Sequence, residues 1–275
     1  MTLLMLNGEL QPAERALVPA LDRGLTHGLG LYETIKLASG LPVFFDEHMD
    51  RLDRGLAQLD LRTPYPRVVV ASQVVRLARA AAIPNGACRV LVTAGAPRGG
   101  PTILIQAEVR SFPTHPLTLI SYRALRSAAD LKSKTFTTSH LAQQAAKAAG
   151  ADDALFVDED GRAHEATTAN LFLYRDGVLC TPPLDGSILP GVIRNQVMTL
   201  ARDDGIPVAE SHIAVDELSS ADTLLLTSSV RGIVQAASVD GVPLATDQQV
   251  TARLRALLRS AETASAERFT ATYNT

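Results

Sequence analysis

Lysine is scarce in this sequence of 275 residues. Only four of its 26 basic residues are lysines, at positions 36, 132, 134 and 147, and the rest are arginines. The arginine guanidinium does not lose its proton near neutral pH, so arginine cannot form a Schiff base. A lysine kept in such a chain is a candidate for amine chemistry. Lys132 and Lys134 lie two apart within residues 129–135. This stretch alone leaves open whether either is reactive or both are solvated charges.

Other features are also missing. The net charge is −3, which argues against nucleic acid as the main partner. No run of about 18 apolar residues could cross a bilayer. No basic segment precedes Asn7-Gly8, so we expect no signal peptide. Cys88 and Cys180 are isolated and the six histidines lack metal-ligand spacing, so we expect no metal site and a reduced, cytoplasmic compartment.

The length suits one large domain or two modest ones. With 46% apolar and 20% charged residues, the composition is that of a globular protein. Two prolines fall within Ser-Phe-Pro-Thr-His-Pro, residues 111–116, which is typical of a linker. We predict a domain over 1–112, a linker over 113–116 and a second domain over 117–275.

The first half predicts strands on both sides of the Asn7-Gly8 turn, with Asp46 as the N-cap of a helix over 46–60. A second helix over 67–82 and strands over 88–93 and 102–108 follow. Glycines at 24, 28 and 30 indicate backbone that turns tightly or lies close to something. His48 and Arg51 share one helix face, which is either solvated or functional.

The second half predicts a strand over 117–122, a helix over 139–149 that ends at Gly150, and several short strands. A further helix begins near Gly191, and a short helical turn covers 215–220. A closing helix runs over 248–265, with a loose tail after Phe269. The short strands are expected over 154–157, 169–174, 178–181, 206–212 and 223–226, with a hairpin over 230–237 and 242–244.

Three places in the chain favour an anion. The helix beginning at Gly191-Val192-Ile193 offers free N–H groups, Thr227-Ser228-Ser229 offers hydroxyls, and Arg51 offers a full charge. Each alone is ordinary capping or turn chemistry. Together with a scarce lysine they suggest a phosphate-bearing cofactor, pyridoxal 5'-phosphate. Glu165 is the acid that would pair with the pyridine nitrogen and make the ring an electron sink, although a surface strand residue is the plain alternative.

The order and spacing of these motifs resemble those of the class IV aminotransferases, the fold-type IV pyridoxal phosphate enzymes. The resemblance runs from Asn7-Gly8 to Asp240-Gly241. Its most specific part is Lys132, the interval to Gly150, Glu165, Asn-Leu-Phe at 170–172, Leu-Pro-Gly-Val-Ile-Arg at 189–194 and Thr-Ser-Ser at 227–229. The resemblance implies an α+β fold with a small N-terminal α/β domain and a larger, β-rich pseudo-barrel domain.

The resemblance also implies roles. Lys132, rather than Lys134, would be the Schiff-base lysine and proton shuttle, and Glu165 would bind the pyridine nitrogen. Leu189 would pack under the ring. The phosphate would be held by Arg51, the Val192 and Ile193 amides, and Ser229 with the Val230 amide. Tyr32, Lys36 and Arg98 would lie on the substrate side, with Arg98 reaching into the neighbouring subunit of a homodimer.

The implied reaction is transamination between a D-amino acid, or an (R)-amine, and a 2-oxo acid such as 2-oxoglutarate or pyruvate. Gly-Leu-Tyr-Glu-Thr-Ile-Lys at 30–36 is most similar to the D-amino acid group, but no histidine follows Arg98 two residues on. Phe136 stands where branched-chain enzymes carry a tyrosine. Ile193 lacks the hydroxyl common in the phosphate cup. Aminodeoxychorismate lyase is the alternative, followed by an L-branched-chain aminotransferase. A non-catalytic binding protein is the other class, although it would have lost Lys132 or Glu165.

Overall fold

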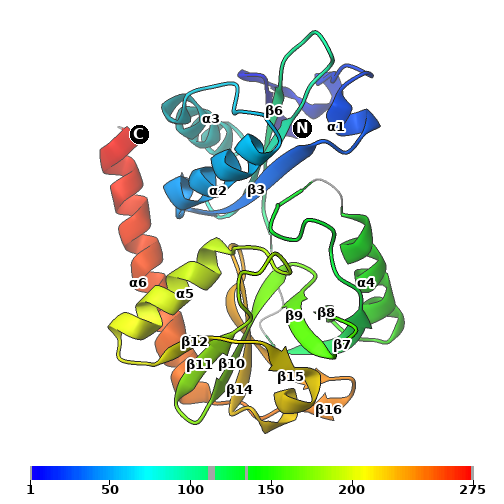
Figure 1. Ribbon diagram of the computed structural model, residues 1–275. Helices are drawn as coiled ribbons and strands as arrows, with labels where there is room; N and C mark the ends of the chain where they lie inside the picture. Colours follow the sequence, from blue (N-terminus) through cyan, green and yellow to red (C-terminus); the bar gives the residue numbers. More distant parts are fainter. Residues whose placement is uncertain (1, 111–114, 134–135, 274–275) are drawn as a thin grey trace. The chain divides into compact units, whose positions relative to one another are not determined.

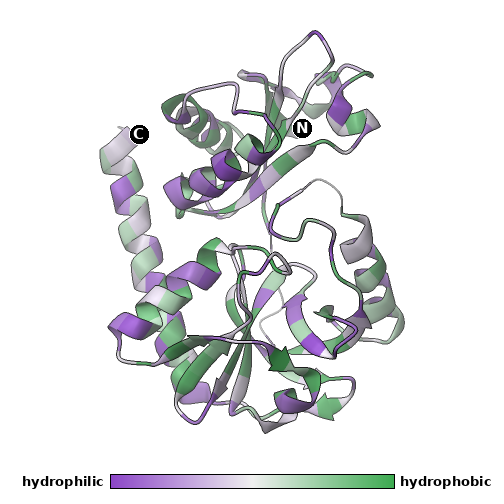
Figure 2. Cartoon of the chain, in the orientation of Figure 1, coloured by the Kyte–Doolittle hydropathy of each residue, from purple (hydrophilic) through white to green (hydrophobic). Residues whose placement is uncertain are grey.

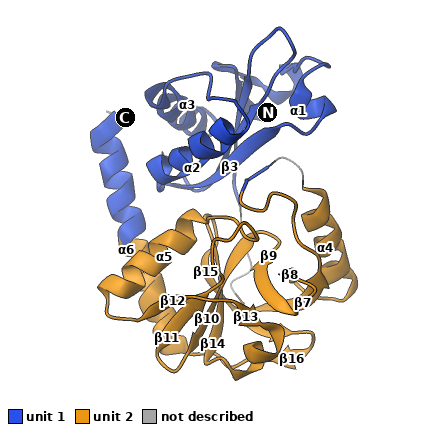
Figure 3. Ribbon diagram, viewed as in Figure 1, with its two compact units in different colours: residues 1–111, 131–135, 261–275 blue, residues 112–130, 136–260 orange. Residues whose placement is uncertain are grey.

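The computed structural model describes residues 2–110, 115–133 and 136–273 (Figure 1). The chain divides into two compact units (Figure 3). Unit 1 comprises residues 1–111, 131–135 and 261–275, and unit 2 comprises residues 112–130 and 136–260. The first unit therefore takes a short central segment and the end of the chain in addition to the N-terminal part. The predicted linker over 113–116 falls partly outside the described residues.

Unit 1 is built on a six-stranded antiparallel sheet in the order β2-β1-β6-β5-β3-β4. The Asn7-Gly8 turn joins the first two strands, as predicted. The strands are β1 (Leu3–Leu6), β2 (Glu9–Pro12), β3 (Gly30–Ala38), β4 (Leu41–Pro42), β5 (Gly86–Thr93) and β6 (Thr102–Glu108). Short helical turns η1 (Ala13–Arg15) and α1 (Arg23–Thr26) lie between β2 and β3 in the chain.

Strand β3 places alternate residues on opposite faces. Leu31, Glu33, Ile35 and Leu37 are buried, whereas the residues between them are half-buried. The buried face packs in one core with helices α2 (Phe45–Gln58) and α3 (Arg67–Ala80). Figure 2 shows hydrophilic and hydrophobic residues interleaved along α2, as expected for a helix with one buried side. A charged residue, Glu33, thus lies within an apolar face.

Two details of the prediction for unit 1 are wrong. The N-cap of α2 is Phe44, in a left-handed conformation at φ 53°, and Asp46 lies inside the first turn. The tail after Phe269 is not loose, because helix α6 (Gln248–Tyr273) continues to Tyr273. The Phe269 ring contacts the rings of Phe45 and Tyr273, and the Tyr273 hydroxyl donates to Asp46 at 2.5 Å. These contacts anchor the end of the helix.

Unit 2 contains a ten-stranded sheet, and part of it closes on itself. Following the pairings from β10 through β14, β15, β7, β8 and β9 returns to β10, so six strands form a barrel around an apolar core. The barrel strands are β7 (Leu117–Arg123), β8 (Asp153–Val157), β9 (Arg162–Ala166), β10 (Ala169–Arg175), β14 (Thr223–Ser228) and β15 (Gly232–Val239). The predicted β-rich pseudo-barrel is confirmed.

The remaining elements of unit 2 extend this barrel. Strands β11 (Val178–Thr181) and β12 (Val208–Glu210) continue the sheet beyond β10, and the strand expected over 206–212 is shorter than predicted. Gly150, at φ 72°, follows α4 as the predicted helix end requires. The other elements are α4 (Thr137–Ala148), α5 (Val192–Asp203), β13 (Ile213–Ala214), η2 (Val215–Ser220), β16 (Val242–Pro243) and the first part of α6.

Candidate active site

The predicted reactive lysine is tied to β3. The Tyr32 amide donates to the Lys132 carbonyl at 3.0 Å, and Ser133 forms an isolated antiparallel bridge with Leu31. The Lys132 Nζ lies 4.9 Å from the centroid of the Tyr32 ring. The structure therefore brings together Lys132 and Tyr32, two residues predicted for the site. Lys134, the alternative lysine, lies outside the described residues.

A buried charged cluster lies on the opposite face of β3. The Glu33 carboxylate accepts from Arg51 Nε at 2.8 Å and Nη2 at 2.6 Å, and His48 Nδ1 lies 2.7 Å from the same carboxylate. Glu33 and His48 are both at most 1% exposed, and Arg51 is 7% exposed. The interpretation of His48 and Arg51 as a solvated helix face is therefore wrong. The Glu33 carboxylate pairs with both side chains and offsets the cost of burying the Arg51 charge and the His48 ring.

The charge states in this cluster follow from the contacts. Burial raises the pKa of Glu33, but the Arg51 charge and the hydrogen bonds from His48 and Arg51 outweigh it and bring the pKa to about 2. Burial, together with the Arg51 and Lys132 charges, lowers the pKa of His48 more than its contacts with Glu33 raise it. An ionised carboxylate only accepts, so Nδ1 of neutral His48 carries the proton. Nε2 is then an acceptor, and among the described residues nothing donates to this buried atom.

The two other predicted substrate residues differ in their surroundings. The Lys36 Nζ forms an ion pair of 2.7 Å with Glu262 on α6, a partner that the sequence did not reveal. Arg98 lies exposed in the turn between β5 and β6. At the base of that loop, the buried Asp22 carboxylate accepts from the Gly24 amide and from Thr93 and Thr102 hydroxyls. The loop is thus fixed at its base and open at its tip.

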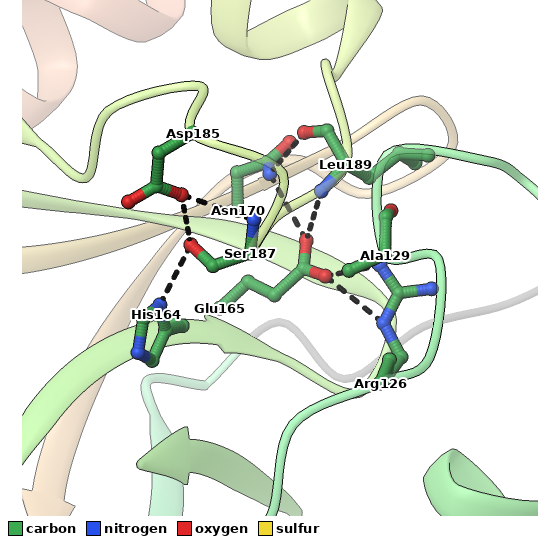
Figure 4. Close-up of polar contacts among 8 residues, drawn as sticks. All are labelled: Arg126, Ala129, His164, Glu165, Asn170, Asp185, Ser187 and Leu189. Carbon is green, nitrogen blue, oxygen red and sulfur yellow. Dashed lines mark hydrogen bonds and ion pairs between the residues drawn. The ribbon is translucent and has the colours of Figure 1, made fainter. Parts of the chain in front are cut away.

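Glu165 occupies the seam where β9 and β10 close the barrel of unit 2. It pairs directly with Asn170 in the strand register, and Asn170 pairs with Thr227. Figure 4 shows the Glu165 carboxylate between two sets of donors. On one side, Asn170 Nδ2 and the Leu189 amide each donate at 3.2 Å. On the other, Arg126 donates through Nε at 3.0 Å and through Nη2.

Sequence reasoning missed both Arg126 and the role of Asn170. Arg126 also donates to the Ala129 carbonyl at 3.0 Å, so it links the segment before Lys132 to the Glu165 carboxylate. Its positive charge offsets the cost of burying Glu165, which is 4% exposed. The only sequence signal for Arg126 was its place just ahead of the lysine motif. Asn170 was part of the Asn-Leu-Phe motif at 170–172, but the sequence did not indicate that it donates a hydrogen bond to Glu165.

The loop before Leu189 is held by a chain of polar contacts, of which Figure 4 shows those among Asp185, Ser187 and His164. Ser187 Oγ donates to the Asp185 carboxylate at 2.5 Å. His164 Nδ1 lies 2.9 Å from Ser187 Oγ. The other ring nitrogen of His164 lies 3.0 Å from Asp158. These contacts fix the loop that delivers the Leu189 amide to Glu165.

The N-terminus of α5 lies next to this carboxylate. Gly191 caps the helix without a side chain, and a Cβ there would come 1.9 Å from Asn170 Oδ1. Val192 and Ile193 fill the first turn and are buried. Thr227 Oγ1, at the end of β14, is buried and has no hydrogen-bond partner among the described residues. Ser229 and Val230 form the turn that follows β14. The helix N-terminus, together with an unsatisfied hydroxyl nearby, suits an anion.

Comparisons with known proteins agree with this architecture. The family model of amino-transferase class IV matches residues 30–239. The chain belongs to the class IV aminotransferases. It is 32% identical over 257 residues to the "Putative branched-chain-amino-acid aminotransferase" of Methanocaldococcus jannaschii, covering 86% of this chain and 88% of that protein. It is 28% identical over 253 residues to the D-alanine aminotransferase of Bacillus licheniformis, with the same two coverages.

The fold is that of the family. The branched-chain aminotransferase from Thermoproteus uzoniensis, solved with norvaline, superposes with a TM-score of 0.89 at 26% identity, covering 98% of this chain and 97% of that one. Class IV aminotransferases use pyridoxal 5'-phosphate, and this chain is therefore a pyridoxal-phosphate-dependent enzyme.

The residues of this aminotransferase fit that cofactor. The buried Glu165 carboxylate, held by fixed donors, suits a protonated ring nitrogen. Gly191 packs closely against Asn170, which brings the N-terminus of α5 beside that residue. The Thr227 hydroxyl, to which no described residue bonds, lies on the strand β14 that pairs with Asn170. Over residues 2–110, 115–133 and 136–273, no group of three or more His, Cys, Asp or Glu side chains is arranged to hold a metal ion. No helix within those ranges is long and apolar enough to cross a bilayer.

Proposed function

We propose that this aminotransferase moves the amino group of a D-amino acid, or of an (R)-amine, to a 2-oxo acid such as 2-oxoglutarate or pyruvate. The observation that carries the proposal is the Lys132 amine, anchored to β3 by its own backbone and lying over the Tyr32 ring. The 30–36 motif and the similarity to a protein named D-alanine aminotransferase support the D-amino acid class.

Lys132 is the proposed catalytic residue. Its ε-amine would hold the cofactor and would take and return a proton at the substrate Cα. When bound, the cofactor supplies an electron-withdrawing ring that stabilises negative charge at that carbon. Glu165 would hold the pyridine nitrogen through its carboxylate, and Leu189 would pack against the ring. Asn170 and Arg126 keep the Glu165 carboxylate in one orientation.

The phosphate would be held by one guanidinium, three backbone amides and one hydroxyl. These are the guanidinium of Arg51, the amides of Val192 and Ile193, and Ser229 with the Val230 amide. Glu33 orients Arg51 through two hydrogen bonds. Tyr32, Lys36 and Arg98 would border the substrate. We further propose a cytoplasmic homodimer, in which Arg98 reaches the partner's site. Light scattering on the purified protein tests the dimer.

The test is a coupled assay of the purified protein with D-alanine and 2-oxoglutarate, in which pyruvate and glutamate must appear in equal amounts. L-Alanine and L-leucine test the L-branched-chain alternative. Pyruvate release from aminodeoxychorismate without any 2-oxo acid would identify the lyase instead. Lys132→Ala must abolish turnover and the shift of the cofactor absorbance on amine addition. Lys147→Ala, on the exposed end of α4, is the matched control and should leave both unchanged.

A further inference from the structure

His164 directly precedes Glu165 in β9, and the loop over residues 185–189 contacts both side chains. The Ser187 Oγ of this loop lies 2.9 Å from His164 Nδ1, and its Leu189 amide donates to the Glu165 carboxylate at 3.2 Å (Figure 4). Neighbouring residues of a strand direct their side chains to opposite faces. The loop is therefore held at two points of β9. Ser187 limits where the Leu189 amide can lie, because the two residues are at most about 7 Å apart along the chain.

Two ionised carboxylates lie at the ends of the contact between Ser187 and His164. The Asp158 carboxylate is 3.0 Å from His164 Nε2. The Asp185 carboxylate accepts from the Ser187 hydroxyl at 2.5 Å and from the Ser187 amide at 3.0 Å, and the hydroxyl lowers the pKa of Asp185. Burial raises the pKa of Asp158, but hydrogen bonds from the Arg162 amide and His164 lower it more. Both carboxylates are therefore charged near neutral pH and can only accept hydrogen bonds.

The protons of His164 can be counted from these bonds. The single proton of the Ser187 hydroxyl lies toward Asp185, so the Ser187 oxygen must accept its bond from His164 Nδ1. Nε2 must likewise donate to Asp158. Both ring nitrogens then carry protons, and the ring is an imidazolium cation that lies between two negative groups.

Other charged groups lie around His164 but take no part in this link, within the part of the chain that the structure describes. The Arg162 side chain, on the same strand, is 45% exposed. His212, just before β13, is exposed and acts on Asp185 only through its charge. The Glu165 carboxylate has an arginine partner of its own. The cation that joins β9 to the loop is therefore His164.

We propose that His164, as an imidazolium, is a positioning residue for the cofactor site, because it holds the loop over 185–189 so that the Leu189 amide reaches Glu165. This inference rests on the proposed role of Glu165 at the pyridine nitrogen. A neutral ring donates from one nitrogen only, so either the bond to Asp158 or the bond between Ser187 and its aspartate must lose its proton. The loop then loses a fixed contact. Cofactor affinity should therefore fall as rising pH removes the proton of His164.

Nitrogen NMR of the holoenzyme with isotope-labelled histidine tests the charge state directly, and the signals missing in His164→Gln identify the ring. At about pH 6 both ring nitrogens of His164 should have the chemical shifts of protonated nitrogen. Raising the pH should move one of them in a single step. Shifts of a neutral ring at about pH 6 would overturn the proposal.

Cofactor affinity gives the functional readout, measured by dialysis of the holoenzyme against graded concentrations of pyridoxal 5'-phosphate. At about pH 6, His164→Gln should bind the cofactor about 2- to 10-fold more weakly than the wild type, the range for one lost hydrogen bond. This ratio should decrease with rising pH, with the same midpoint as the NMR titration. His212→Gln, an exposed histidine beside the same loop, is the matched control and should bind the cofactor like the wild type at every pH.

Ser187→Ala separates the link from the folding of β9, because it keeps the ring and removes only its contact with the loop. It should weaken cofactor binding by a similar factor, and the double variant should bind no more weakly than either single variant. A ratio that is constant with pH, or additive effects of the two substitutions, would overturn the role of His164. Glu165→Gln that binds the cofactor like the wild type would overturn the proposed role of Glu165 and this inference with it. A weakened Glu165→Gln beside an unaffected His164→Gln would overturn the role of His164 alone.

Discussion

Replacing Glu33 by Gln should destabilise the protein strongly. Glu33 accepts two hydrogen bonds from Arg51 and one from His48, all within the core between β3 and α2. The fall of its pKa from an ordinary 4.5 to about 2 corresponds to about 3 kcal/mol in favour of the charged form. Removing one partner of a buried ion pair costs about 3–5 kcal/mol, because the other charge stays buried. We expect Glu33→Gln to lose an amount in this range.

The measurement is urea unfolding followed by circular dichroism at neutral pH, with and without cofactor. Asp50→Asn is the control, on the helix α2 that carries Arg51 and His48, because Asp50 pairs with Arg67 at the surface and its side chain is 51% exposed. Exposed pairs contribute at most about 1 kcal/mol. A free energy of unfolding for Glu33→Gln within 1 kcal/mol of the control would refute the reasoning that the cluster depends on this carboxylate.

The pH dependence gives an independent check on Glu33. Its folded pKa lies below its unfolded pKa, so its contribution to stability is fully present above about pH 4.5 and is lost as the pH falls toward 2. The wild type should therefore lose stability across this window more steeply than Glu33→Gln does. Parallel acid-unfolding curves for the two proteins would contradict the pKa assigned to Glu33.

Three further changes test other parts of the structure. Gly191→Ala should lower cofactor affinity and cost about 1–3 kcal/mol, because its Cβ would fall 1.9 Å from Asn170 Oδ1; cofactor titration of this variant is compared with Gly99→Ala, where the added Cβ finds ordinary contacts. The pKa of His48 is lowered in the folded state, so the free energy of unfolding of the wild type should fall from about pH 7 to 5 as the unfolded state takes up protons. Chemical unfolding of His48→Gln should show a weaker dependence on pH over this range, and an unchanged dependence would contradict the lowered pKa. Phe269→Ala should cost about 3–5 kcal/mol in unfolding experiments, because its ring is buried between two aromatic rings; a loss below 1 kcal/mol would mean that the end of α6 is not anchored.

Local signals in the sequence predicted most of the elements. The turn at Asn7-Gly8 and the glycine after α4 are each encoded within a few residues, so turn and helix-end signals suffice. Glu165 was likewise predicted in its strand, which is β9. The N-cap predicted for α2 was wrong. Asp46 is a residue type that often caps helices, but the chain enters the helix through Phe44 in a left-handed conformation.

Partners that join distant segments could not be predicted in this way. The Arg126–Glu165 pair spans 39 residues and depends on the closure of β9 against β10, which no local pattern reports. The Glu33–Arg51 pair depends on α2 packing against β3. The end of α6 was predicted to be loose because the residues that anchor it, Phe45 and Asp46, lie more than 200 residues earlier in the sequence.

A chain rich in arginine and poor in lysine hides its functional arginines among structural ones. Residue type does not separate them, because every guanidinium has the same charge and the same donors. An ion pair with the fold does not separate them either, because Arg51, Arg126 and Arg194 each donate to a carboxylate of the chain, and Arg51 alone of these three is proposed to hold the phosphate.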